Sequence, residues 1–252
     1  DLRRFRMKKF LLILSMLALC LAPHSIAQEA EHERAMAAFR EGRLDDALAH
    51  VDEAIATHPD WWFPVVLKGT VLFRKGDYKE SIKALNDALT LEIPSNEIPK
   101  AKYYIAKSYL QLKEYPKAIH AFDEIIPQAP KSRLFDLYMN RGQSEMQIAK
   151  AADAANDSSK SSSFYSKSIV SFSEALKNPA PKKNLEVEAA FQKAYAQYQI
   201  GNFEGSRLSL EKSIDAFKDV IERDPKEVRA HKFIINLSFR IAQGASDAQK
   251  PG

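Results

Sequence analysis

The sequence is poor in the residues that build disulfides, thiol centres and phosphate-binding loops. Cys20 is its only cysteine, so the chain forms no internal disulfide and offers no cysteine pair for a metal or redox centre. Only 8 of the 252 residues are glycine, and "GNFEG" (201–205), the nearest approach to a glycine-rich loop, lacks the lysine that phosphate binding needs. No histidine pair has the spacing of metal ligands on one helical face. We therefore expect no enzymatic activity, no metal and no cofactor.

Long hydrophobic runs are also scarce, and the one clear run lies near the N-terminus. The basic segment "MKKF" begins at Met7, and the apolar run that follows covers residues 10–21. A membrane-spanning helix needs about 20 apolar residues, which is more than this run supplies. Pro23 and the small residues before Gln28 complete the pattern of a secretory signal peptide. The sequence predicts removal of residues 1–27, with cleavage after Ala27, and hence an exported, periplasmic protein.

A lipid anchor is the alternative interpretation of the same segment. Bacterial lipoproteins carry their lipid on a cysteine, and "LALC" ends at Cys20. Such signals have a small residue immediately before the cysteine, whereas this sequence has Leu19. An outer-membrane lipoprotein attached through Cys20 therefore remains the less favoured hypothesis.

An excess of one charge sign is missing once the predicted signal is set aside. The whole sequence has 37 basic and 33 acidic residues, a formal net charge of +4. Five of the basic residues and one acidic residue lie within 1–27, which leaves 32 of each sign. Nucleic-acid binding requires a basic face, so we expect no nucleic-acid partner.

What the sequence does contain is a helical pattern that recurs after 34 residues. The segments "GRLDDALAHVDEAIATHPD" (42–60) and "GDYKESIKALNDALTLEIP" (76–94) share one plan. Each has a glycine that lets a helix end and the chain reverse, then small residues where two helices cross closely. Asp77 and Glu80 also have the spacing of a capping box. The matched pairs are Ala35/Gly69, Gly42/Gly76, Ala47/Ser81 and Ala54/Ala88.

This pattern resembles the tetratricopeptide repeat family, whose unit is a 34-residue helical hairpin. The resemblance continues through "AKYYIAKSYLQLKEYPKAIHAFDEIIPQAP" (101–130), where Lys113 replaces the turn glycine. It implies an all-α fold: a right-handed superhelical solenoid of about five stacked hairpins with a C-terminal capping helix. The expected units cover 28–61, 62–95, 99–132, 135–180 and 187–223, followed by a cap at 225–243 and a disordered tail at 244–252.

The fourth and fifth units depart from the plan. The fourth carries an insertion, 151–163, whose serine-rich stretch "ANDSSKSSS" (155–163) predicts an exposed loop. In the fifth, Gly201 is the expected turn residue, and two registers of the second helix stay open. These registers place either Ser206 and Leu210 or Ser213 and Phe217 against the first helix.

Within the resembling family, ligands lie in a concave groove lined by the first helix of each hairpin. Some members hold a terminal carboxylate with a Lys/Asn clamp, but the corresponding positions here are His32, Met36, Val66 and Thr70, so that clamp is absent. The remaining aromatic wall, dotted with cations, suits an amphipathic helix or an extended segment. The candidate partner-binding groove comprises Phe39, Arg40, Val66, Thr70, Phe73, Arg74, Tyr103, Lys107, Met139, Gln143, Phe191, Tyr195 and Tyr198. The same helices place Phe63, Lys100, Leu110, Gln111, Met146 and Gln199 on this wall.

These expectations define a function class without a named partner. The sequence predicts a non-catalytic protein–protein interaction scaffold of the bacterial cell envelope, with a protein or peptide as its ligand. A lipid-anchored envelope assembly factor is the alternative, and it depends on lipidation of Cys20.

Overall fold

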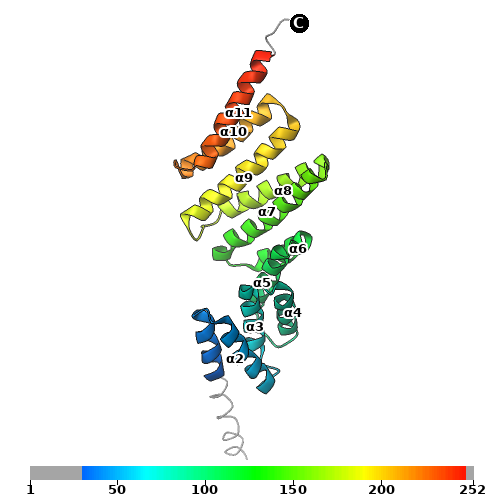
Figure 1. Cartoon of the computed structure of the whole chain (residues 1–252), viewed down its shortest axis with the longest axis vertical. Helices are drawn as coiled ribbons and strands as arrows, with labels where there is room; N and C mark the ends of the chain where they lie inside the picture. Colours follow the sequence, from blue (N-terminus) through cyan, green and yellow to red (C-terminus); the bar gives the residue numbers. More distant parts are fainter. Residues whose placement is uncertain (1–29, 248–252) are drawn as a thin grey trace, which may run out of the picture. The chain divides into compact units, whose positions relative to one another are not determined.

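The computed structural model describes residues 30–247, and every regular element among them is helical. A helix over residues 30–40 comes first in this range (Figure 1). The others are α2 (Leu44–Thr57), α3 (Trp62–Lys75), α4 (Tyr78–Leu89), α5 (Ile98–Gln111), α6 (Tyr115–Ile125), the short 3-10 helix η1 (Ile126–Gln128), α7 (Lys131–Ala154), α8 (Ser158–Leu176), α9 (Lys183–Glu204), α10 (Arg207–Arg223) and α11 (Val228–Asp247). The predicted all-α fold is confirmed. The predicted signal segment and residues 248–252 of the tail lie outside the described residues.

The chain divides into two compact units, with the boundary inside α5 after Ser108. The described part of unit 1 covers residues 30–108, and that of unit 2 covers 109–247. Within unit 1, α3 packs against both α2 and α4. Within unit 2, α7 to α11 each pack on the next helix along the chain, so the sequence order is also the stacking order (Figure 1).

The predicted close crossing between α3 and α4 is present in unit 1. The Ser81 hydroxyl donates a 2.7 Å hydrogen bond to the carbonyl oxygen of Gly69, and Ser81 is fully buried. A Cβ atom on Gly69 would lie 2.4 Å from Cγ of Leu85. Only glycine allows this approach, because close-packed interiors leave no room for an added methyl group.

The turns between helices use the left-handed backbone region, as the glycines predict. Gly42 and Gly76 have φ angles of 79° and 92°. Lys113, which replaces the turn glycine in the third hairpin, adopts the same region with φ of 61°. The predicted capping box at α4 is wrong in its detail, because the Asp77 side chain makes no capping hydrogen bond.

The expected loop at 155–163 is wrong, because the insertion lengthens two helices. Only residues 155–157 separate α7 from α8. The Asp157 carboxylate caps α8 by accepting a hydrogen bond from the backbone N–H of Lys160. The Asp153 carboxylate accepts hydrogen bonds from the hydroxyls of Ser161 and Tyr165, both fully buried. Serine is small enough to lie between two helices, so Ser161 packs there, whereas residues 155–160 are exposed although α8 begins at Ser158.

A buried carboxylate joins the same two helices. Glu145 on α7 is 1% exposed, and its Oε1 lies 3.0 Å from the guanidinium of Arg141. The Ser171 hydroxyl on α8 donates a 2.6 Å hydrogen bond to the other carboxylate oxygen. Burial raises the pKa of Glu145, and the hydrogen bond and the Arg141 charge oppose that rise only in part.

Glycines also mark close crossings in the later hairpins, and one predicted turn needs correction. A Cβ on Gly142 would lie 2.9 Å from the ring of Phe172. Gly201 is not the turn residue, because α9 continues to Glu204 and the left-handed turn lies at Gly205. Gly201 instead packs on Ser213, because a Cβ on Gly201 would lie 2.8 Å from the Ser213 hydroxyl oxygen. The second helix of the fifth unit therefore adopts the register with Ser213 and Phe217.

The last described helix, α11, closes on α10. Leu237 and Ala230 are fully buried, and the predicted stripe of Phe233 and Ile241 packs beside them. The helix reaches Asp247, beyond the predicted end at residue 243. Between residues 30 and 247, no helix is long and apolar enough to cross a membrane.

Candidate functional site

The predicted groove residues are divided between the two units. Eight of the thirteen lie in unit 1 and five in unit 2. Four of them, Val66, Thr70, Met139 and Phe191, are buried, so they contribute to packing and not to an open wall. The Thr70 hydroxyl, for example, donates to the carbonyl oxygen of Val66 within α3.

Unit 1 brings several predicted residues together as a row of cations on aromatic rings. The Arg74 guanidinium lies 4.7 Å from the ring centroid of Phe39 and donates a 3.0 Å hydrogen bond to the Phe39 carbonyl. The Lys107 ammonium lies 5.4 Å from the Phe73 ring and 5.6 Å from the Tyr103 ring. Cations held over aromatic faces in this way stabilise neighbouring helices by about 0.5–1 kcal/mol each at exposed sites. These predicted cationic and aromatic residues of unit 1 therefore lie together and contact one another.

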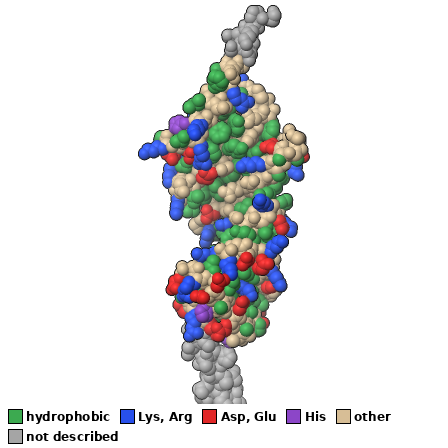
Figure 2. All heavy atoms as spheres, viewed as in Figure 1, with side chains coloured by type: hydrophobic (Ala, Val, Ile, Leu, Met, Phe, Trp, Pro, Cys, Tyr) green, Lys and Arg blue, Asp and Glu red, His purple; other side chains and the backbone are tan. Residues whose placement is uncertain are grey.

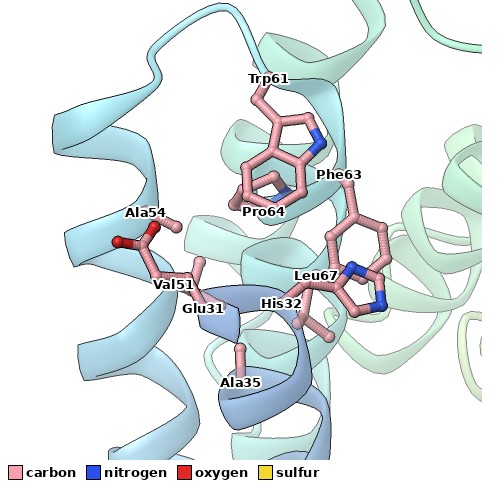
Figure 3. Close-up of a pocket in the computed structure, with 9 residues that line it drawn as sticks. All are labelled: Glu31, His32, Ala35, Val51, Ala54, Trp61, Phe63, Pro64 and Leu67. Atoms are coloured by element: carbon pink, nitrogen blue, oxygen red, sulfur yellow. The ribbon is translucent and has the colours of Figure 1, made fainter. Parts of the chain in front are cut away.

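A second aromatic cluster in unit 1 is packed shut. Figure 3 shows His32 of the first helix against Phe63 of α3, with Trp61 and Pro64 above them. The rings of His32 and Phe63 are stacked at 4.0 Å, and the hollow between these residues does not admit a water molecule. His32 therefore has a packing role in this structure.

The open cavity lies in unit 2, between the end of α5 and helices α7 and α9. It has a volume of about 370 Å³, within the range of about 300–1,000 Å³ typical of ligand pockets. Four of its nine lining side chains are glutamines, and we call it the glutamine pocket. It is lined by Leu110, Gln111, Lys113, Tyr115, Gln143, Met146, Gln147, Lys150 and Gln192.

Sequence reasoning found part of this lining and missed the rest. Leu110, Gln111, Gln143 and Met146 are on the predicted wall. The missed residues on α7, Gln147 and Lys150, follow Gln143 and Met146 by one turn, so helical periodicity alone could have found them. Lys113 and Tyr115 were missed because they belong to the turn and to a second helix. Gln192 lies on α9 one position from the predicted Phe191.

The charges on the pocket lining are all positive. Lys113 and Lys150 are its only charged side chains, and no carboxylate lines it. Among nearby acidic residues, Glu114 pairs with Lys117 at 2.6 Å, and Glu188 pairs with Arg229 at 2.9 Å while also accepting a 2.5 Å hydrogen bond from the Gln192 amide of the lining. On the face drawn in Figure 2, acidic side chains are denser over unit 1 than over unit 2. The pocket therefore presents amides and cations.

Lys150 links the pocket to the predicted Tyr195. Its ammonium lies 5.2 Å from the centroid of the Tyr195 ring, and the Gln199 amide donates a 2.6 Å hydrogen bond to the Tyr195 hydroxyl. Tyr195 and Tyr198 are also in contact with Phe233 of α11, at ring distances of 6.0 and 5.0 Å. The far end of the predicted wall is therefore partly covered by the last helix.

The described residues contain no group of three or more His, Cys, Asp and Glu side chains placed to hold a metal ion. Glu145, a carboxylate whose pKa is raised by burial, is enclosed between α7 and α8 and does not line the pocket. What the pocket offers chemically is hydrogen bonding and positive charge.

Repeated helical hairpins with small residues at their crossings define this chain as a helical-repeat protein. A family model described as tetratricopeptide repeat matches residues 66–133. A TPR repeat-containing protein of Methanocaldococcus jannaschii is 39% identical over 59 residues, which cover 23% of this chain and 18% of that protein. The match thus spans under a fifth of the curated relative's length.

Solved structures extend the likeness to most of the fold. MamA residues 41-end from Desulfovibrio magneticus RS-1 superposes with a TM-score of 0.58 at 16% identity, over 79% of this chain and 96% of that one. YrrB, described as a TPR protein with an unusual peptide-binding site, gives 0.57 at 15% identity, over 79% and 87%. Residues 66–133 therefore match the tetratricopeptide repeat, and the chain has the helical solenoid fold of the tetratricopeptide-repeat structures that it resembles. Its fold is that of a protein–protein interaction scaffold.

Proposed function

We propose that this protein is a non-catalytic scaffold of the bacterial cell envelope, which holds a peptide or helical segment of a partner in the glutamine pocket. The observation that carries the proposal is the pocket itself. It is an open cavity of about 370 Å³ lined by four amide side chains from three helices. Amide side chains both donate and accept hydrogen bonds, which matches the needs of a bound polypeptide.

Two further points support a peptide ligand. YrrB, which shares the fold, is described by its peptide-binding site. The buried Met146 and the half-buried Leu110 give the pocket an apolar part beside its amides. Ligand sites in general combine apolar surface with a few polar groups that fix orientation.

In-cell photocrosslinking tests the binding site. A photoreactive amino acid is placed at Gln147 in the pocket and, in a matched variant, at the exposed Lys212 on α10, outside the pocket. The proposal expects a discrete protein adduct from the Gln147 position and none, or a much weaker one, from Lys212. Equal adducts from both positions would show that the partner does not bind preferentially at the pocket.

The envelope location is a separate part of the proposal. It is supported by the signal-like pattern of residues 7–27, which lies outside the described residues. The intact mass of the protein isolated from its own cells should correspond to a chain that begins at Gln28. A diacylated chain beginning at Cys20 would establish the lipid-anchored alternative, and a chain that keeps residues 10–21 would contradict export by cleavage.

A further inference from the structure

We infer that the glutamine pocket binds an acidic segment in extended conformation, within a partner protein. The inference rests on the proposed binding function and narrows it in two respects, the charge of the ligand and its backbone conformation. Each respect follows from a different property of the pocket lining.

The charge follows from the two cations. Lys113 stands at the α5–α6 turn and Lys150 on α7, and no carboxylate lines the cavity between them. Lys113 is exposed and Lys150 is exposed apart from its contact with Tyr195. A basic ligand would meet two like charges with no compensating acid, whereas carboxylates would gain charge-assisted contacts, which are roughly twice as strong as neutral ones.

The conformation follows from the amides. Gln111, Gln143, Gln147 and Gln192 come from α5, α7 and α9 and line one cavity. The Gln192 amide already donates a 2.5 Å hydrogen bond to Glu188, so Gln111, Gln143 and Gln147 are the amides that would pair with a ligand. A helical ligand satisfies its own backbone groups and would lay apolar side chains on these amides, leaving them without water or partner. Each buried polar group left without a hydrogen-bond partner weakens the complex. An extended backbone carries unpaired N–H and C=O groups and can pair with the amides instead.

The apolar part of the pocket predicts how apolar and acidic residues are spaced in the sequence of the ligand. In an extended chain, successive side chains point to opposite sides, so alternate residues face the same wall. One apolar side chain on Leu110 and Met146, with acidic residues two positions before and two positions after it directed to the two lysines, satisfies the whole lining. The ligand class is therefore an internal acidic segment with an apolar residue, and it does not require a free C-terminus.

The test uses three fluorescein-labelled synthetic peptides and the full chain, with binding measured by anisotropy at low salt. The first carries Glu two positions before and two positions after each Leu, with polar uncharged residues between them, and contains proline to prevent helix formation. The second has the same composition without proline and in helical amphipathic order. The third is the first with Lys in place of every Glu. We expect the first peptide to bind at least about tenfold more tightly than either of the others, because tenfold corresponds to only 1.4 kcal/mol.

Two variants locate the binding. The double variant Lys113→Gly with Lys150→Gln should weaken the binding of the first peptide by about tenfold, as expected when charge-assisted contacts are lost. Lys113→Gly suits the positive φ at that position, so folding is preserved, and thermal melts check it. The matched control Lys212→Gln, on α10 outside the pocket, should leave affinity unchanged.

Several outcomes overturn the inference. They are no binding of the acidic extended peptide, equal or tighter binding of the helical or lysine peptide, or insensitivity to the double variant. Equal competition by polyphosphate would show a general anion site and contradict a peptide-specific one. If crosslinks from Gln147 still capture a protein, the proposed function stands while this inference fails. If they capture none, the proposed function fails on its own test.

Discussion

The Ser171 hydroxyl lies 2.6 Å from a carboxylate oxygen of Glu145, and both residues are within 1% of full burial. This contact fastens α8 to α7 at a depth where a charged group loses most of its hydration. The raised pKa of Glu145 means that the folded chain takes up a proton at a higher pH than the unfolded chain does.

That difference in proton uptake gives stability a predictable pH dependence. As pH falls from 7 toward the ordinary carboxyl pKa, the folded state binds more protons, so its free energy of unfolding gains a favourable contribution. This contribution is fully present below the unfolded-state pKa and is lost as pH rises through the folded-state pKa. Urea unfolding at pH 7 and pH 5 should therefore show the native chain gaining stability relative to Glu145→Gln on acidification. Parallel pH profiles for the two proteins would show that Glu145 is not perturbed; the exposed-site variant Glu53→Gln is the control.

The Gly69 crossing predicts a steric effect. Gly69→Ala places a Cβ 2.4 Å from Cγ of Leu85 and should lower the free energy of unfolding by about 1–3 kcal/mol, the usual cost of overpacking. Gly244→Ala is the matched control, because that helical glycine has nothing within 4 Å of an added Cβ. There we expect no loss, and up to about 1 kcal/mol of gain from helix propensity. Equal effects at both sites in urea titrations would refute the close crossing.

The turn at Lys113 predicts a stabilising substitution. A non-glycine residue in the left-handed region costs about 1–2 kcal/mol, so Lys113→Gly should raise the free energy of unfolding by about 1 kcal/mol. Gly76→Ala, at φ of 92°, should lower it by a similar amount although its Cβ meets little. Chemical denaturation of both variants provides the comparison. Destabilisation by Lys113→Gly would mean that the lysine side chain stabilises this turn.

The helical insertion makes Asp153 structurally important. Asp153→Ala leaves the fully buried Tyr165 without the partner of its 2.8 Å hydrogen bond and should cost about 1–3 kcal/mol. Tyr165→Phe in the same background should then cost little more, because the unsatisfied hydroxyl is gone. Urea titrations of the single and double variants give the coupling free energy between Asp153 and Tyr165. Additive losses would show that the two side chains act independently, as an exposed loop would allow.

The sequence predicted the repeat architecture well, because a helical hairpin imposes small residues at fixed spacing. Gly69 and Ser81 could be paired from their separation alone, and the structure confirms their contact. The insertion could not be predicted in the same way. Its serines predicted a solvated loop, but Ser161 and Tyr165 donate hydrogen bonds to the half-buried Asp153 carboxylate on the preceding helix, a contact that depends on tertiary packing.

The candidate site was predicted only in outline. First-helix periodicity placed Gln143 and Met146 on the right face of α7. It also assigned Val66 and Phe191 to the wall, although both are buried. Periodicity predicts the direction in which a side chain points, but it does not predict how far neighbouring helices bury that side chain. A partner can contact only side chains that remain exposed.

The most direct test of the binding site uses an unbiased map of contacts. The partner captured from cells is purified, mixed with the full chain and treated with a carbodiimide, which joins lysine amines to nearby carboxylates, and the modified positions are identified by mass spectrometry. The account predicts that crosslinks concentrate at Lys113 and Lys150, which line the glutamine pocket. Crosslinks concentrated at Lys167, Lys212 and Lys218, on α8 and α10, would contradict it and place the partner on the second helices.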